Sequence, residues 1–207
     1  MLNEPVVDEG ARVDEVDRAM REFGFAVGPL RLLDEIGLEV TQRIAEPLEK
    51  AFGERMPRLR AIAELIAAGC VGRTSRAGFY LWRGASRLDR VWRRPRRVAN
   101  PAVHQVRPPA GMDQATIHDR LALRLVNECI RCLEDGVLRS PADGNVGAVL
   151  GIGFPPFLSG PFHYADSLGL QVVVDKLSGL AEQHGARFIP ADLLLERARE
   201  GRTFFES

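Results

Sequence analysis

The sequence contains few cysteines, no long apolar run and no excess of either charge. Three cysteines in 207 residues, an odd and sparse set, do not indicate a disulfide framework. No apolar run approaches the roughly 18 residues of a membrane-spanning helix, and the first residues lack the basic and apolar regions of a secretory signal peptide. We therefore expect a reduced cytoplasmic protein without a membrane span. Basic and acidic residues number 28 each, so no overall field favours nucleic acid.

Motifs for nucleotide binding and for hydrolysis are also missing. Gly151-Ile152-Gly153 begins like a dinucleotide fingerprint, but Pro156 stands where the third glycine is needed, and a helix rather than a strand is expected before it. No Gly-x-Ser-x-Gly sequence is present. The sequence predicts neither a dinucleotide site nor a serine hydrolase site.

The cysteines and histidines form no recognisable metal or catalytic pattern. Cys129 and Cys132 share a helix face, but no second Cys or His pair has the spacing that would complete four zinc ligands. Core packing is the favoured interpretation of this pair. His118 is adjacent to Asp119, and adjacent residues on a helix do not face each other. We assign no catalytic residue and no metal site, and no function to His104, His118, His163 or His184.

An internal repeat organises the chain. Residues 2–38 recur in residues 126–170 with the same order of features. Each copy has Asn-Glu on a helix, a turn with Glu-Gly or Asp-Gly, a second helix, an apolar loop ending in Gly-Pro, and a third helix. Agreement at both ends and in the middle indicates a duplication.

Local signals define the helices of the two copies. Ser140-Pro141 offers an N-cap hydroxyl and a proline at the first helical position. In the first copy Asp17 is expected to favour the positive end of its own helix dipole. Gly24 and Gly153 should end these helices. The next helices are expected to begin near Leu30 and Phe162. The apolar residues of the Gly-Pro loops should line buried loops or the interface between the repeats: Phe25, Val27, Leu30, Phe154, Phe157, Leu158 and Phe162.

A different segment joins the two copies. A helix is expected from Met56 to about Ala68, followed by a glycine-rich turn and a short aromatic strand at 79–82. A second strand around 90–92 would complete a hairpin, and the prolines of 93–112 indicate a surface loop. A helix should then run over 114–134. The predicted organisation is a first repeat at 1–55, a linker at 56–112 and a second repeat at 113–207.

Three stretches resemble one protein family. Gly24–Leu38 is similar to the C-terminal domain motif of 3-hydroxyacyl-CoA dehydrogenases. Gly72–Tyr80 resembles the glycine-rich, basic Gly-Phe-Tyr motif of that family. Gly151–Tyr164 resembles the second copy found in multifunctional α-subunits of the fatty-acid oxidation complex. The resemblance covers nearly the whole chain.

The resemblance implies chemistry that this chain alone does not carry. In the family, a Rossmann domain precedes the helical domain, binds NAD, and holds the His–Glu pair that serves as general base and its orienter. A family Asn that assists in the site lies upstream of Met1, and Asn3 matches a later position of the same, truncated helix. We expect no cofactor in this chain and NAD in the complete enzyme. The resemblance implies a substrate cleft wall at Phe25, Val27, Gly28 and Pro29, with Val27 in place of the usual Met or Pro.

The fold class that follows is mainly α. Two similar helical repeats would pack as an internal pseudo-dimer, joined by a short β-hairpin and loop linker. Single-copy relatives dimerise through this domain, so we expect a monomer here. The expected partners are a Rossmann domain, in cis or in trans, and a 3-hydroxyacyl-CoA of β-oxidation. Two alternatives stay open: a non-catalytic acyl-CoA-binding or oligomerisation module, and a dehydrogenase of the same superfamily acting on another 3-hydroxyacid.

Clustered arginines have several possible roles. Arg73 and Arg76 in the Gly-Phe-Tyr motif are candidates for the phosphates of coenzyme A, because guanidinium groups bind phosphate through paired donors. The arginine-rich stretch 83–97 is favoured as a solvated loop. A contact to coenzyme A or to an acidic partner comes second. Nucleic acid comes last, because the stacking aromatics nearby are limited to Trp82 and Trp92.

Overall fold

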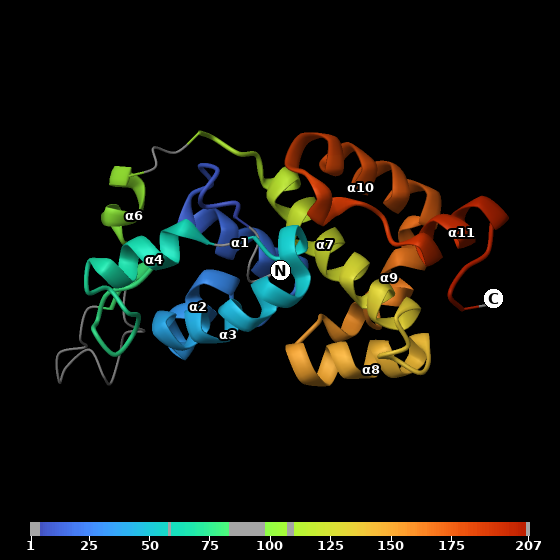
Figure 1. Cartoon of the computed structure of the whole chain (residues 1–207), viewed down its shortest axis with the longest axis horizontal. Helices are drawn as coiled ribbons and strands as arrows, with labels where there is room; N and C mark the ends of the chain where they lie inside the picture. The colour runs from blue at the N-terminus through green and yellow to red at the C-terminus, as the bar shows by residue number, and fades with distance from the viewer. Residues whose placement is uncertain (1–4, 58, 83–97, 107–109, 206–207) are drawn as a thin grey trace. The chain divides into compact units, whose positions relative to one another are not determined.

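The computed structural model describes residues 5–57, 59–82, 98–106 and 110–205, and most of them are helical (Figure 1). The chain divides into two compact units. The N-terminal unit contains the chain up to Arg21 together with Val27–Ile117. The C-terminal unit contains Glu22–Ala26 and the chain from His118 onward. The prediction of a mainly α fold is confirmed.

The N-terminal unit combines helices with a small antiparallel sheet. Strand β1 pairs with β2, with Tyr80 opposite Ala99 and Leu81 opposite Val98. The elements in chain order are α1 (Val13–Phe23), α2 (Pro29–Ile36), α3 (Leu38–Phe52), the 3₁₀ helix η1 (Gly53–Arg55), α4 (Arg60–Ala67), β1 (Tyr80–Leu81), β2 (Val98–Ala99) and α6 (Pro101–Val106).

The C-terminal unit contains the long helix α7 from His118 onward and the helices that follow it. Most apolar side chains of α7 in this unit are buried, among them Leu121, Val126 and Ile130. The elements in chain order are α7 (Gln114–Glu134), α8 (Pro141–Ile152), the 3₁₀ helix η2 (Pro156–Leu158), α9 (Pro161–Leu168), α10 (Leu170–His184), the 3₁₀ helix η3 (Ala186–Phe188) and α11 (Asp192–Glu200).

Prolines and glycines set the same helix boundaries in both units. Helices α2 and α9 each have eight residues and begin with a proline, which is compatible with the first helical position. Gly37 and Gly169 then link these helices to α3 and α10, each of 15 residues. Both glycines have positive φ, 99° and 85°, a conformation that favours glycine.

Several expected boundaries are confirmed. Helix α7 covers 114–134, and α1 and α8 end immediately before Gly24 and Gly153. Helices α2 and α9 begin one residue before the expected positions, at the prolines. The hydroxyl of Ser140 accepts a hydrogen bond from the Asp143 backbone N–H at 3.1 Å, so the predicted N-cap is present.

Other expectations need correction in the linker. The helix expected from Met56 begins at Arg60, where the Asp8 carboxylate accepts hydrogen bonds from the N–H groups of Arg60 and Ala61 at 2.7 and 2.9 Å. The 93–112 region is not only loop, because α6 starts at Pro101 in a position that suits proline. The strand expected at 90–92 and the arginine-rich stretch 83–97 lie outside the described residues, and β1 pairs with Val98–Ala99 instead.

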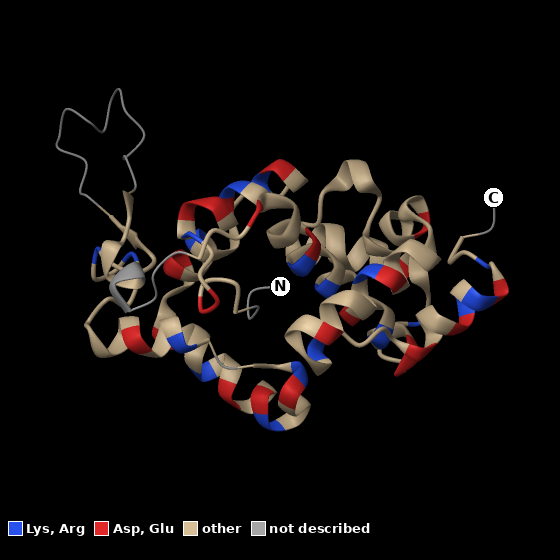
Figure 2. Ribbon diagram, turned by 90° about the horizontal axis from the view of Figure 1, so that it is seen from above, with Lys and Arg blue, Asp and Glu red and all other residues tan. Residues whose placement is uncertain are grey.

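Charge is distributed rather than segregated. Figure 2 shows acidic and basic residues interspersed along the helices of both units. In the part of the chain that the structure describes, no helix is long and apolar enough to cross a bilayer.

Candidate functional site

Asp17 fixes the loop that contains most of the candidate cleft wall. Its carboxylate accepts hydrogen bonds from the N–H groups of Leu30 at 2.8 Å and Arg31 at 3.1 Å, and from the Tyr80 hydroxyl at 2.8 Å. The Gly28 backbone passes so close that a Cβ atom there would overlap the Asp17 side chain. The expectation that Asp17 serves its own helix was wrong, because its carboxylate caps the start of α2.

Asp34 fixes the Gly-Phe-Tyr motif in a similar way. Its carboxylate accepts hydrogen bonds from the N–H groups of Phe79 at 2.8 Å and Tyr80 at 2.9 Å, and from the Trp82 indole at 2.9 Å. A side chain at Gly78 would overlap this carboxylate, so the motif requires glycine there. The glycine thus permits a close approach between β1 and the end of α2.

Burial controls the protonation of these groups. Desolvation raises the pKa of Asp17 above its ordinary value of 3.8, and the hydrogen bonds from Tyr80, Leu30 and Arg31 oppose that rise. Desolvation also raises the pKa of Asp34, opposed by its three donors. The pKa of Tyr80 is raised by burial and by the nearby Asp17 carboxylate. These groups hold backbone segments in place, and their donors and acceptors are engaged within the fold.

The four predicted cleft-wall residues are divided between the two units. Phe25 belongs to the C-terminal unit, where the centroid of its ring lies 5.8 Å from that of Phe23 and 6.1 Å from that of Phe154. Val27, Gly28 and Pro29 belong to the N-terminal unit. Gly28 and Pro29 are buried, and Val27 is half-buried.

The two arginine candidates lie in an exposed turn of the N-terminal unit. The guanidinium of Arg73 stands over the Trp82 ring at 5.6 Å from its centroid. Arg76 adopts φ of 61°, an uncommon conformation for a non-glycine residue. Both side chains are exposed and therefore accessible to a solvated anion.

The aromatic loop of the C-terminal unit is only partly as expected. Phe154 and Phe162 are fully buried, but Phe157 is 71% exposed, so the prediction that its ring is buried was wrong. Leu158, like Val27, is half-buried. Phe154, which precedes η2, lies in the core, and Phe157, within η2, lies at the surface.

His118 and His163 pack on aromatic rings. His118 packs on Phe23 at 5.0 Å between ring centroids, and its Nδ1 lies 3.3 Å from the Asp119 carboxylate. The expectation that these adjacent side chains do not face each other was therefore wrong, because they come within hydrogen-bond distance. His163 stacks on Phe205 with 3.9 Å between the ring centroids.

Desolvation raises the pKa of Cys129 to about 12, which keeps the thiol protonated and unreactive. Across the described ranges, no group of three or more His, Cys, Asp or Glu side chains could hold a metal ion.

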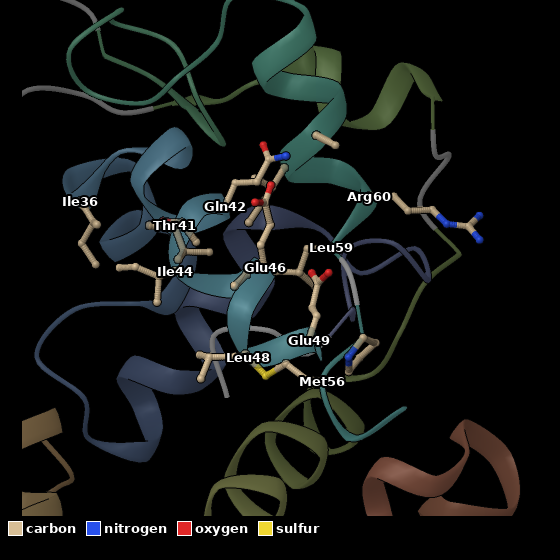
Figure 3. A pocket seen from close by; sticks show the side chains of 15 residues that line it. Ile36, Thr41, Gln42, Ile44, Glu46, Leu48, Glu49, Met56, Leu59 and Arg60 are labelled. Carbon is tan, nitrogen blue, oxygen red and sulfur yellow. The ribbon is translucent and has the colours of Figure 1, made fainter. Parts of the chain in front are cut away.

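A cavity of about 340 Å³ lies in the N-terminal unit between α2, α3 and α4 (Figure 3). Its wall is mostly apolar, with carboxylates from α3 among the lining groups. The lining side chains that the figure labels are Ile36, Thr41, Gln42, Ile44, Glu46, Leu48, Glu49, Met56, Leu59 and Arg60. No pattern in the sequence predicted this cavity.

The chain matches known proteins along most of its length. The family model for the 3-hydroxyacyl-CoA dehydrogenase C-terminal domain matches residues 4–82. The fatty acid oxidation complex subunit alpha of Shewanella amazonensis is 42% identical over 200 residues, which are 95% of this chain and 27% of that protein. The corresponding subunit of Vibrio vulnificus is 39% identical over 210 residues, covering 100% of this chain and 27% of that protein. The chain belongs to the 3-hydroxyacyl-CoA dehydrogenase C-terminal domain family. It spans about a quarter of the length of these relatives.

Solved structures support the same fold for this family member. The crystal structure of 3-hydroxybutyryl-CoA dehydrogenase from Escherichia coli K12 has a TM-score of 0.71 at 22% identity, covering 94% of this chain and 56% of that one. The dehydrogenase part of multifunctional enzyme 1 from C. elegans has a TM-score of 0.57 at 19% identity, covering 88% of this chain and 41% of that one.

Proposed function

We propose that this chain is the C-terminal substrate and assembly portion of an NAD-dependent 3-hydroxyacyl-CoA dehydrogenase of fatty-acid β-oxidation. The supporting observation is the 42% identity over 95% of the chain to a fatty acid oxidation complex subunit alpha. The chain aligns with 27% of that subunit, so the NAD site and the general base would come from a Rossmann domain, in cis or in trans. NAD supplies hydride acceptance in that complete enzyme.

Within this portion, the loop before α2 would form part of the acyl-CoA cleft wall. Phe25, Val27, Gly28 and Pro29 are the wall residues in this proposal. The Asp17 hydrogen bonds support it, because they hold the start of α2 in one position. A fixed wall positions a substrate without ordering cost at the moment of binding. Exposed Arg73 and Arg76 would bind the phosphates of coenzyme A.

We also propose that two copies of one repeat pack on each other as an internal pseudo-dimer, which makes the chain a monomer. Parallel hydrogen bonds within each unit support the duplication. Asp17 accepts from the N–H at the start of α2, and Asn145 accepts from the Phe162 N–H at the start of α9 at 2.9 Å. Asp34 accepts from Phe79 and Tyr80, as Asp166 does from Phe204 and Phe205 at 2.9 and 3.0 Å.

The test compares the chain alone with the chain plus a separate Rossmann-domain chain. Fluorescence titration of the chain with NADH should show no micromolar binding, because a glycine-rich strand–helix turn is required for the pyrophosphate. NADH production from 3-hydroxybutyryl-CoA and NAD should require an added Rossmann-domain chain, because a general base must reach the substrate hydroxyl. Turnover by the chain alone would overturn the proposal.

Two alternative functions give different results in the same experiment. A non-catalytic acyl-CoA-binding or oligomerisation module would bind acyl-CoA, or assemble, and yield no turnover with any Rossmann-domain chain. A dehydrogenase for another 3-hydroxyacid would turn over that acid with the added chain and leave 3-hydroxybutyryl-CoA unchanged. The names of the relatives favour the fatty-acid substrate.

A further inference from the structure

The two units make the same connection with segments of different length. Residues 70–78 lead from the glycine beyond the end of α4 to the two N–H groups that donate to Asp34. Residues 202–203 lead from the glycine beyond the end of α11 to the two N–H groups that donate to Asp166. The two glycines have similar φ, 74° and 66°. Two residues thus complete the connection in one unit and nine in the other, so the fold itself does not require the seven additional residues.

The longer connection contains a turn that hydrogen bonds close, residues 72–78, which we call the arginine turn. The Gly72 N–H donates to the Ala77 carbonyl at 2.8 Å, and the Trp82 N–H donates to the Arg76 carbonyl at 2.8 Å. The Ser75 hydroxyl lies 2.8 Å from the Ala77 carbonyl oxygen and 3.1 Å from that of Gly72. A turn closed in this way presents its exposed side chains from a fixed backbone.

Arg76 holds an uncommon backbone conformation in this turn. Its φ is 61°, in the region that favours glycine over residues with a Cβ atom. Its side chain is exposed and makes no hydrogen bond, ion pair or ring contact with the described residues. Packing within the described fold therefore does not explain why an arginine stands there, and a disfavoured conformation at such a residue points to function.

Trp82 gives the arginine turn an aromatic surface. Its indole N–H donates to the Asp34 carboxylate at 2.9 Å, which holds the ring beside the turn. The guanidinium of Arg73 stands over this ring at 5.6 Å from the centroid, and Trp82 is only half-buried. Aromatic rings and guanidinium planes are the surfaces on which nucleotide bases stack.

The positive charge of the turn is not neutralised by the acids of α2. The Asp34 carboxylate is buried and accepts three hydrogen bonds, and Glu35 pairs with Arg31 at 2.7 Å. In the part of the chain that the structure describes, neither Arg73 nor Arg76 forms an ion pair. Two exposed guanidinium groups three residues apart suit a phosphate monoester, which carries about 1.5 to 2 negative charges and accepts paired hydrogen bonds.

We propose that the arginine turn and Trp82 bind the adenosine 3′-phosphate end of coenzyme A. Arg73 and Arg76 hold the 3′-phosphate, and the adenine stacks on the Trp82 ring and the guanidinium beside it. The 3′-phosphate is the monoester of coenzyme A, and each phosphate of its pyrophosphate carries less charge. This inference rests on the acyl-CoA substrate of the proposed function and assigns one end of that substrate to a named segment.

Adenosine 3′,5′-bisphosphate, which reproduces this end of coenzyme A, is the probe for a direct test with the full chain. Isothermal titration calorimetry should show saturable binding of one molecule per chain, weakened by salt because the arginines are exposed. Arg73→Ala should weaken binding about tenfold, equivalent to about 1.4 kcal/mol. Arg202→Ala is the matched control, because it removes an exposed arginine from the shorter connection of the other unit, and it should bind like the parent.

Arg76→Gly separates binding from folding. Because glycine suits a φ of 61°, this variant should keep or raise the melting temperature and still weaken binding about tenfold. A lower melting temperature with parental binding would mean that Arg76 serves the fold alone, and would overturn the proposal.

Three further results would also overturn it. These are no saturable binding of the bisphosphate, equal binding of ADP, which lacks the 3′-phosphate, and equal binding of inorganic phosphate, which lacks the base. Failure here is distinct from failure of the proposed function. Turnover of 3-hydroxybutyryl-CoA with an added Rossmann-domain chain, but no bisphosphate binding, would reject this inference alone. Bisphosphate binding lost in Arg73→Ala, without such turnover, would reject the proposed dehydrogenase alone.

Discussion

The two units use different side chains for the same backbone contact. In the N-terminal unit the Asp17 carboxylate accepts from the Leu30 N–H at 2.8 Å and also from the Tyr80 hydroxyl. In the C-terminal unit the Asn145 amide oxygen accepts from the Phe162 N–H at 2.9 Å. Phe205 stands where the Gly-Phe-Tyr motif has Tyr80, and it has no hydroxyl to donate. A buried carboxylate is thus found where a hydroxyl donor accompanies it, and a neutral amide where the donor is missing.

This difference follows from the cost of burying charge. An ionised group away from water needs several hydrogen bonds, and a neutral amide needs fewer. Asn145 makes one such bond through its oxygen, while its Nδ2 is buried without a hydrogen-bond partner among the described residues. The N-terminal unit holds the more polar version of the contact and the C-terminal unit the more apolar one. Matched substitutions in the two units can measure what each version contributes.

The largest expected difference concerns α10 and α3. Leu177→Ala in the fully packed C-terminal unit should lower the free energy of unfolding by about 3–5 kcal/mol, because it leaves a cavity. Ala45→Leu at the matching position of α3 should change it by less than about 1 kcal/mol, because the new side chain enters existing space. Urea unfolding followed by circular dichroism gives both values. Equal and large losses for the two variants would show that α3 is packed as tightly as α10.

The next largest difference in the free energy of unfolding should come from removing the acids near the ends of α2 and α9, Asp34 and Asp166. Asp34→Ala removes the acceptor for two backbone N–H groups and the Trp82 indole, and should cost about 2–4 kcal/mol. Asp166→Ala removes the acceptor for Phe204 and Phe205 only, in a half-buried site near the end of the described chain. It should cost about 1 kcal/mol. Urea unfolding of both variants tests whether the indole contact and the deeper burial of Asp34 explain the difference. A larger loss for Asp166→Ala than for Asp34→Ala would contradict this explanation.

Much of this framework was predictable, and the hydrogen-bonded acids show where prediction stopped. The helices bounded by Ser140-Pro141, Gly24 and Gly153 were predicted because capping is a local property. The roles of Asp17 and Asp34 were not, since their donors lie far along the chain. A signal was nevertheless present for Asp17: it falls on the apolar face of α1, where an acid without a partner would be costly.

Local sequence patterns predicted even less of the candidate site. Phe154 and Phe157 are both aromatic and lie between prolines, yet one is buried and the other exposed. Tertiary packing of the loop decides which ring is buried, and residue preference alone does not encode that packing. The cavity arises from the packing around α3, which the amphipathic pattern of α3 alone does not reveal.

Exchange of the capping residue should have an intermediate effect. Asn145→Asp places a carboxylate in a buried site without a hydroxyl donor, and should cost about 2 kcal/mol near pH 7. By analogy with the Tyr80 hydroxyl, which donates to Asp17, adding Phe205→Tyr should recover about 1 kcal/mol. A double-mutant cycle by urea unfolding measures this coupling. Strictly additive losses would mean that the hydroxyl does not select the carboxylate.

The pH dependence of stability should distinguish the units more weakly. Burial raises the pKa of Asp17, so the folded state holds this proton more tightly than the unfolded chain. That contribution is fully present below the ordinary pKa of 3.8 and is lost as pH rises through the raised pKa of the folded state. Asp17→Asn should therefore flatten the decline of the unfolding free energy above about pH 4. If Asp17→Asn leaves the dependence of the unfolding free energy on pH unchanged, the pKa of Asp17 is not raised. Asn145→Asp should make the decline of the unfolding free energy with pH steeper than in the parent.

The smallest expected effect concerns the exposed aromatic of the C-terminal unit. Phe157 is 71% exposed, so Phe157→Ala removes little buried surface and should change the free energy of unfolding by less than about 1 kcal/mol. Phe154→Ala, three residues away and fully buried, is the matched control and should cost about 3–5 kcal/mol. Urea unfolding of both variants should therefore separate two phenylalanines of one loop. A loss above about 2 kcal/mol for Phe157→Ala would mean that its ring is covered in solution, because an exposed side chain has too little buried area to contribute that much.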